Sequence, residues 1–112
     1  DELTTTGITY VAELKAGIVR EFEVTPEQAG LEKVKLEAIK GGDAAYNAER
    51  LKALLAGQKD AYRDIVLLNA GAALTVAGKA KTLSDGVEIA GENIDNGNAQ
   101  KALDRLVTIT NS

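Results

Sequence analysis

Hydrophobic and polar residues alternate along residues 8–24, which is the two-residue period of β-strands with one covered face. One face of the first run is mainly apolar and carries Ile8, Tyr10, Ala12 and Leu14. The second run covers residues 18–24, and Gly17 lies between the two runs, where it can adopt the positive φ of a tight turn. The pattern predicts a β-hairpin. Because an isolated hairpin is marginally stable in water, we expect it to join a larger sheet whose other strands lie upstream.

Beyond Gly41 the apolar positions recur about every 3.6 residues, which is the period of an α-helix. Four helices are expected: one from a cap at Asp43 to Gly57, one over residues 62–77, one from a cap at Thr82, and one from a cap at Asn98. The inward positions of the first, third and fourth helices are Ala44, Ala48, Leu51 and Leu55, then Leu83, Val87, Ala90 and Ile94, then Ala99, Ala102, Leu103, Leu106 and Ile109. The second helix is apolar nearly all round, which predicts burial on several sides.

The expected fold is therefore an α/β segment, a β-hairpin followed by about four helices. Residues 1–26 form an N-terminal turn and the hairpin, residues 27–42 a connector, and residues 43–112 the helical part. With 112 residues and 45% hydrophobic content, the chain fits one domain or part of one. It contains no methionine and begins with Asp1, so we expect it to be a piece of a longer protein.

Composition excludes several kinds of chemistry. Without histidine or cysteine, the chain offers no imidazole base, thiolate nucleophile, disulfide or ordinary zinc site, so any bound metal would have oxygen ligands. The net charge is -4 with both signs interspersed, and we therefore expect no nucleic-acid partner. The longest uncharged stretch, residues 65–78, is too short to span a bilayer, and no signal peptide is recognisable, so we expect no membrane partner and a cytoplasmic location.

Three places could carry chemistry. Asp1 and Glu2 are adjacent carboxylates that could hold a hard cation such as Mg²⁺, although acidic pairs are also common on exposed surfaces without a ligand. Residues 41–43, Gly-Gly-Asp, precede a predicted helix where glycine loops can bind phosphate, but the charge of Asp43 favours a capping role. Asn69 interrupts the apolar second helix, and we expect its amide to bond a neighbouring backbone group rather than a ligand.

Several strings also occur in the order and at the spacings of one enzyme family. They are DELTTTG at 1–7, VAEL at 11–14, VREF at 19–22, TPE at 25–27, GGDA at 41–44 with NA at 47–48, and RDIVLLNA at 63–70. Over essentially its whole length, the chain resembles the C-terminal third of the anthranilate phosphoribosyltransferase family. The resemblance implies the closing part of a large α/β domain of the phosphoribosyltransferase and nucleoside-phosphorylase type.

The same resemblance implies a function. Members of that family transfer phosphoribose from phosphoribosyl pyrophosphate (PRPP) to the amine of anthranilate in tryptophan biosynthesis, with Mg²⁺ as cofactor and pyrophosphate as product. Asp1 and Glu2 match the family's metal-binding pair, which turns the interpretation of these residues toward a metal role. The family's phosphate loop, substrate-binding residues and dimer-forming helical domain would all lie upstream, in the N-terminal remainder of the chain. We therefore expect no other catalytic residue here and no activity from this segment alone.

Two departures from the family pattern and two alternatives accompany this interpretation. Ile8 stands where the family usually has proline, which predicts a looser exit from the metal turn, and Gly71 interrupts what is often an alanine run. One alternative is a non-catalytic interaction module with the same fold. The other is part of a pyrimidine nucleoside phosphorylase, which shares the architecture.

Overall fold

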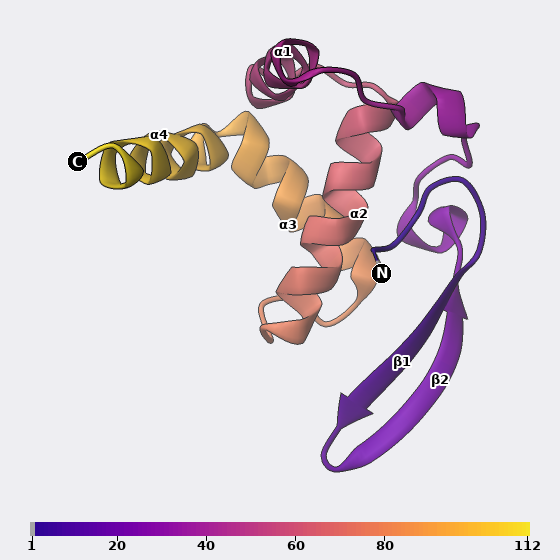
Figure 1. The fold of residues 1–112 in the computed structure, drawn as a ribbon. Helices are drawn as coiled ribbons and strands as arrows, with labels where there is room; N and C mark the ends of the chain where they lie inside the picture. The colour runs from indigo at the N-terminus through magenta and orange to yellow at the C-terminus, as the bar shows by residue number, and fades with distance from the viewer. Residues whose placement is uncertain (1) are drawn as a thin grey trace.

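The structure, a computed structural model, describes residues 2–112 and consists of a hairpin followed by helices (Figure 1). In chain order the elements are β1 (Thr9–Lys15), β2 (Ile18–Val24), the short 3₁₀ helices η1 (Pro26–Ala29) and η2 (Leu36–Ile39), and the α-helices α1 (Ala44–Leu55), α2 (Ala61–Val76), α3 (Leu83–Asp95) and α4 (Asn98–Thr110). The predicted α/β arrangement of a hairpin and four helices is confirmed.

The predicted hairpin forms, and its turn contains one unexpected residue. β1 and β2 pair antiparallel from Thr9 opposite Val24 to Lys15 opposite Ile18. The two turn residues both have positive φ, 52° at Ala16 and 78° at Gly17. Glycine adopts this conformation freely, whereas alanine does so at a cost of roughly 1–2 kcal/mol. Within residues 2–112 the sheet has only these two strands, so the larger sheet stays a prediction.

The two faces of the hairpin have different surroundings. The face that carries Val11 and Phe22 lines a hollow of about 290 Å³ together with residues of α2 and the start of α3. On the opposite face Tyr10 and Leu14 are 76% and 71% exposed. The more apolar face of the alternation is therefore the uncovered one among the described residues.

Side-chain caps define the starts of most helices. Asp43 accepts a hydrogen bond from the Tyr46 amide at 2.8 Å, and Thr82 accepts one from the Asp85 amide at 3.1 Å, so both predicted caps are confirmed. The Thr-Pro-Glu junction is a capping box, in which the side chains of Thr25 and Gln28 each accept from the other's backbone amide. It opens η1.

The predicted cap at Asn98 is wrong. Gly97, with φ 85°, occupies the N-cap of α4, and Asn98 is the first helical residue. The Gly97 amide donates to the carbonyl of Ile94 in α3, and its carbonyl accepts from the amide of Lys101 in α4. One left-handed glycine thus closes one helix and opens the next, and the side chain of Asn96, just before it, accepts from the Asn98 amide at 3.0 Å. The Asn98 side chain instead donates to Asn93 Oδ1 at 2.9 Å.

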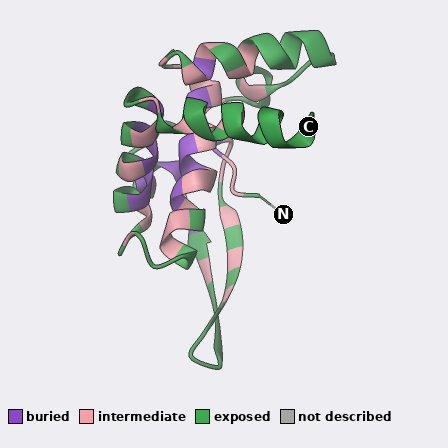
Figure 2. Ribbon diagram, turned by 90° about the vertical axis from the view of Figure 1, so that its left-hand side faces the viewer, coloured by how far each residue is buried: buried purple, intermediate pink, exposed green. Residues whose placement is uncertain are grey.

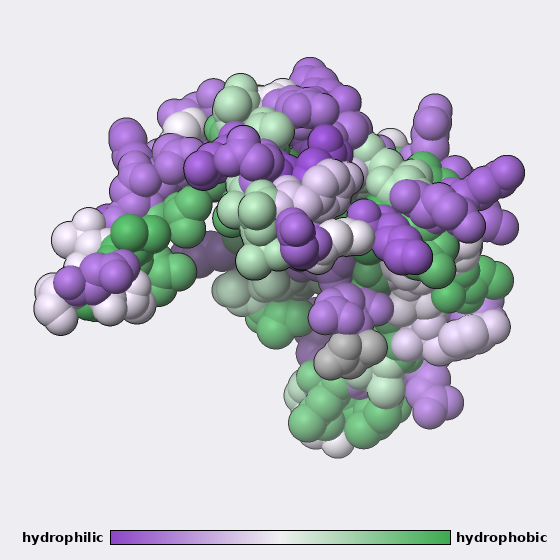
Figure 3. Space-filling model, turned by 45° about the horizontal axis from the view of Figure 1, so that its top comes forward, coloured by the Kyte–Doolittle hydropathy of each residue, from purple (hydrophilic) through white to green (hydrophobic). Residues whose placement is uncertain are grey.

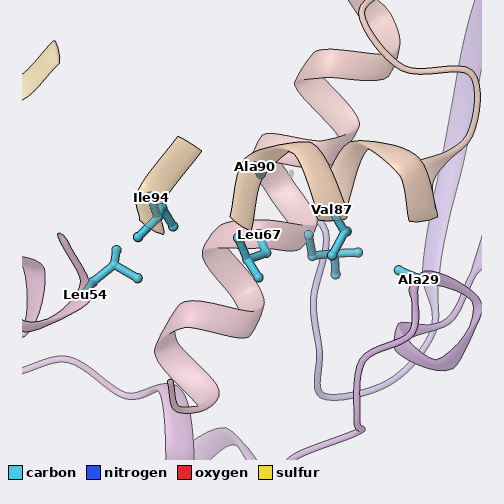
Figure 4. Packing of buried hydrophobic residues seen from close by; sticks show 7 residues of the cluster. Ala29, Leu54, Leu67, Val87, Ala90 and Ile94 are labelled. Carbon is cyan, nitrogen blue, oxygen red and sulfur yellow. The ribbon is translucent and has the colours of Figure 1, made fainter. Parts of the chain in front are cut away.

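The core lies where α2 crosses α3. Seven buried residues form it: Ala29, Leu54, Leu67, Leu68, Val87, Ala90 and Ile94. Figure 4 shows six of them labelled, with side chains from η1, α1, α2 and α3 directed toward one another. The predicted inward positions Val87, Ala90 and Ile94 of α3 are confirmed, and α2 buries residues on several sides as expected.

Two glycines allow the two core helices to approach closely. A Cβ added to Gly86 of α3 would lie 2.4 Å from the carbonyl oxygen of Gly71 in α2. One added to Gly71 would lie 2.7 Å from the backbone nitrogen of Val87. Atoms this close clash, so only glycine fits at either position. Gly71, the apparent departure from an alanine run, is explained by this contact.

The inward faces predicted for α1 and α4 are largely exposed. In α1 only Leu54 is buried, whereas Ala44 and Ala48 are exposed. The stripe predicted for α4 is covered only near its start, and Leu106 and Ile109 are 57% and 66% exposed. Figure 2 shows α4 exposed along most of its length, and Figure 3 shows hydrophobic atoms at the surface of this projecting helix. Hydrophobic periodicity identified these helices correctly, but among residues 2–112 their apolar faces are covered only in part, at half-buried positions such as Leu51 of α1 and Ala99 of α4.

An apolar hollow of about 550 Å³ lies between the helices. Its lining is contributed by all four α-helices and includes Leu51, Leu55, Val66, Leu74, Ile94 and Ala99. None of the described helices combines the length and the hydropathy that crossing a bilayer requires.

Candidate functional site

The candidate site is the N-terminal turn, of which Glu2 is the first described residue; Asp1 lies outside the described residues. Glu2 is exposed, and the next residue, Leu3, is half-buried and packs against the hydrophobic core. The acidic side chain is therefore accessible to solvent while the backbone directly after it is held against the protein. This arrangement can present a carboxylate to a cation without requiring its burial.

Asn69 of α2 holds the backbone of this turn. Its Oδ1 accepts from the Leu3 amide at 2.9 Å, and its Nδ2 donates to the Leu3 carbonyl at 2.9 Å. The same Nδ2 also donates to the carbonyl of Ile65, one turn earlier in α2, at 3.0 Å. The expectation that Asn69 bonds backbone groups is confirmed, but its main partner is 66 residues away in the chain, beside the acidic pair.

Three threonines shape the rest of the turn. The hydroxyls of Thr4 and Thr6 lie 2.7 Å apart, and the Thr4 amide donates to Thr9 Oγ1 at 3.0 Å. Thr5 is fully buried, and its carbonyl accepts from the Val34 amide at 2.9 Å. Its hydroxyl has no hydrogen-bond partner among the described residues, which is unusual for a buried polar atom.

No three acidic, histidine or cysteine side chains gather to form a site within residues 2–112. Mg²⁺ is commonly held by one or two carboxylates together with water and substrate phosphates, so a third protein ligand is not required. The exposed Glu2 carboxylate supplies the type of oxygen donor that Mg²⁺ prefers.

The Gly-Gly-Asp loop has a structural role. Besides the cap at Asp43, the side chain of Asn47 accepts from the Gly42 amide at 2.9 Å and donates to the Gly42 carbonyl at 3.0 Å. The amides of Gly42 and Tyr46, which a phosphate would need as donors, are thus already bonded to the side chains of Asn47 and Asp43. The capping interpretation is therefore the one the contacts support.

Sequence reasoning missed two ion pairs that join the helices. Arg63 of α2, whose side chain is only 7% exposed, donates two hydrogen bonds to the Asp95 carboxylate at the end of α3, at 2.9 and 3.1 Å. These bonds hold the pKa of Asp95 below its ordinary value. Arg50 of α1 also pairs with a carboxylate, that of Asp60, the N-cap of α2. Nothing in the local sequence marks partners so far apart, although a lone arginine in an apolar helix is a signal that a carboxylate must be near.

The pKa of one carboxyl group, that of Asp64, is shifted in the opposite direction. Partial burial in the first turn of α2 raises the pKa of Asp64, and the nearby carboxylates of Asp60 and Glu32 raise it further. Asp64 has no place in the N-terminal turn, and we assign it no role in the candidate site.

Comparison with known proteins gives concordant results. A relative from Chelativorans sp. (strain BNC1) named anthranilate phosphoribosyltransferase is 53% identical over 99% of this chain and 33% of its own length. One of the same name from Paramagnetospirillum magneticum is 58% identical over 99% of this chain and 32% of its own length. Among solved structures, anthranilate phosphoribosyltransferase (TrpD) from Thermus thermophilus matches with a TM-score of 0.85 and 37% identity, covering 96% of this chain and 32% of that one.

The chain thus spans about a third of the length of the curated relatives it matches. The family model described as the a/b domain of the glycosyl transferase family matches residues 1–100, which includes the acidic turn, the hairpin, the core helices and the start of α4. The chain therefore belongs to the glycosyl transferase family, as part of its a/b domain.

Proposed function

We propose that this chain is a segment of an anthranilate phosphoribosyltransferase, which moves phosphoribose from PRPP to the amine of anthranilate. The observation that carries the proposal is the identity of 52% or more to relatives of that name along essentially the whole chain. In the reaction, the bond between the anomeric carbon and pyrophosphate breaks, a carbon–nitrogen bond forms, and the amine loses a proton. The names of the relatives favour this activity over that of a nucleoside phosphorylase.

Within this function we propose that Asp1 and Glu2 bind Mg²⁺. The bound ion would offset the negative charge that develops on the departing pyrophosphate oxygens. The part of this chain is to present carboxylates at a fixed place, and the exposure of Glu2 beside the anchored Leu3 supports that part. The upstream remainder of the protein would hold the sugar phosphate and anthranilate and would form the homodimer. The expected location of the complete enzyme is the cytoplasm.

The test is a magnesium titration of the full-length enzyme. The double variant Asp1→Asn and Glu2→Gln should need more Mg²⁺ and more PRPP for half-maximal rate, with a nearly unchanged thermal midpoint. The matched control is Glu49→Gln, which removes one exposed carboxylate on α1, where its ion-pair partner is Lys52 of the same helix. Identical Mg²⁺ and PRPP dependence in wild type and double variant would remove the metal role. The 112-residue segment alone should show no turnover once contaminating full-length enzyme is excluded.

A further inference from the structure

The contact between Asn69 and Leu3 fixes a short piece of backbone unusually well. Its two hydrogen bonds, both 2.9 Å long, join one side-chain amide to the amide and the carbonyl of the same residue. Two antiparallel bonds to one residue set the distance of that residue from α2 and also its rotation. A single hydrogen bond would leave the rotation free.

Asn69 itself is held in a rigid support. It projects from the middle of α2, whose neighbouring residues Leu67 and Leu68 are buried in the core. The further bond from Nδ2 to the Ile65 carbonyl restricts the rotation of the side chain. The amide is therefore oriented before it meets Leu3, so little conformational entropy is lost in forming the contact.

The packing of α2 does not require an asparagine at this position. The surrounding helix is apolar, and an aliphatic residue of similar size would fill the same space without the cost of withdrawing an amide from water. The feature that uses the amide fully is the backbone of Leu3, whose half-buried amide and carbonyl need partners. Asn69 thus serves the N-terminal turn rather than its own helix.

The N-terminal turn has further attachments to the protein after Leu3, so the contact between Asn69 and Leu3 matters most for the residues up to Leu3. The carbonyl of Thr5 is bonded by the Val34 amide, and the Thr4 amide by Thr9 Oγ1. The chain after Leu3 therefore has other attachments to the protein. Glu2 is one residue before Leu3 and about 3.8 Å away along the backbone, so a shift of Leu3 moves Glu2 with it.

We propose that Asn69 is a positioning residue for the cation site: by bonding Leu3, it holds Glu2 where the metal and the substrate diphosphate meet. This inference rests on the metal role proposed above for Asp1 and Glu2. Residues that orient metal ligands without touching the metal commonly change affinity or activity by about 10–100-fold when they are replaced. Residues of that kind usually bond the side chain of a metal ligand. Asn69 would instead act on the backbone, through its bonds to Leu3.

The test uses the full-length enzyme with Asn69→Leu and a matched control, Asn93→Leu. Asn93 is also half-buried in an α-helix and also donates Nδ2 to the carbonyl four residues earlier, that of Ile89, at 2.9 Å. Its other side-chain bond goes to Asn98 at the start of α4, away from the N-terminal turn. The first readout is hydrogen exchange of the Leu3 amide without metal. The second is the dissociation constant of Mg²⁺ measured by calorimetry in the presence of pyrophosphate.

We expect Asn69→Leu to speed exchange at Leu3 and to weaken Mg²⁺ binding about 10- to 100-fold. The control should leave both values close to wild type. Unchanged Mg²⁺ affinity in a folded Asn69→Leu protein overturns the inference, as does an equal loss in the control. If Asn69→Leu does not fold, Asn69→Asp decides by the same measurements, because it keeps the acceptor for the Leu3 amide and loses both donated bonds.

The two proposals fail in different ways. If Glu2→Gln leaves Mg²⁺ affinity unchanged, the metal role is wrong, whatever Asn69 does to exchange at Leu3. If Glu2→Gln weakens Mg²⁺ binding and Asn69→Leu does not, the metal role stands and the positioning role is wrong.

Discussion

Replacing Gly86 by alanine should destabilise the protein by forcing its two core helices apart. The new Cβ would lie 2.4 Å from the Gly71 carbonyl oxygen and 2.9 Å from the Gly71 Cα, and both atoms are backbone that no rotamer change can move. A normal contact between carbon and oxygen needs about 1 Å more than the shorter distance. Helices α2 and α3 must therefore separate or shift by about that amount.

The cost follows from what that separation does to the core. Leu67 and Leu68 of α2 and Val87 and Ala90 of α3 belong to the buried cluster that the two helices share. A gap of about 0.5–1 Å forfeits a quarter to a half of the dispersion energy of atoms in contact, and overpacking of this kind typically costs about 1–3 kcal/mol. Alanine returns up to about 1 kcal/mol through its higher helix propensity. If the full propensity gain is realised, the free energy of unfolding falls by about 0–2 kcal/mol relative to wild type, and by about 1–3 kcal/mol relative to an alanine placed in the same helix without the clash.

Gly91 provides the matched control in the same helix. It is buried like Gly86, but a Cβ there would lie 3.5 Å from Arg63 Nη2 and 3.9 Å from the nearest Leu67 methyl, which are ordinary contacts. Gly91→Ala should therefore be neutral or stabilising by up to about 1 kcal/mol. Equilibrium urea unfolding of the two variants and wild type decides the matter. A Gly86→Ala protein as stable as Gly91→Ala would refute the close-approach argument.

Three further outcomes follow from the structure. Because the Arg63 guanidinium lowers the pKa of Asp95, their ion pair stabilises the fold above the ordinary carboxyl pKa of 3.8, and this stabilisation is lost as the pH falls through the lowered pKa. The difference in unfolding free energy between wild type and Asp95→Asn, measured by urea unfolding at several pH values, should therefore shrink on acidification. A difference independent of pH would contradict this. The raised pKa of Asp64 contributes with the opposite sign, but it is common to both proteins and cancels. Asp43→Ala should lower the free energy of unfolding by about 1 kcal/mol and speed hydrogen exchange of the α1 amides, whereas Asp43→Asn should retain the cap. Equal exchange of the α1 amides in the two variants would oppose the capping role. The isolated segment should associate through the exposed stripe of α4, and a monomer by light scattering at high concentration would count against this.

The sequence was sufficient for features whose causes are local. The hairpin, the four helices and the caps at Asp43 and Thr82 depend on residues within a few positions of one another, and they form as predicted. The cap predicted at Asn98 failed because Gly97 takes the N-cap position, and the side chain that bonds the first amide of α4 belongs to Asn96. Periodicity also cannot say whether an apolar face is covered, which is why the stripes of α1 and α4 were assigned inward.

The candidate site shows the same division between local and distant causes. The acidic pair and the polar Asn69 were both recognisable, one by resemblance and the other by its apolar surroundings. Their connection was not, because the hydrogen bonds to Leu3 span 66 positions and have no periodic signature. The Arg63–Asp95 pair, 32 positions apart, was missed for the same reason.

The glycine shared by α3 and α4 makes this junction sensitive to chain length. Gly97 bonds backward to Ile94 and forward to Lys101, so the direction of α4 is determined by the φ and ψ of a single residue. Inserting or deleting one residue here would turn α4 by about 100° about its own axis, since an α-helix has about 3.6 residues per turn. The stripe of Leu103 and Leu106 would then face a different neighbour. Insertions and deletions should therefore be tolerated less well here than in an ordinary surface loop, even though α4 itself contributes no buried residue.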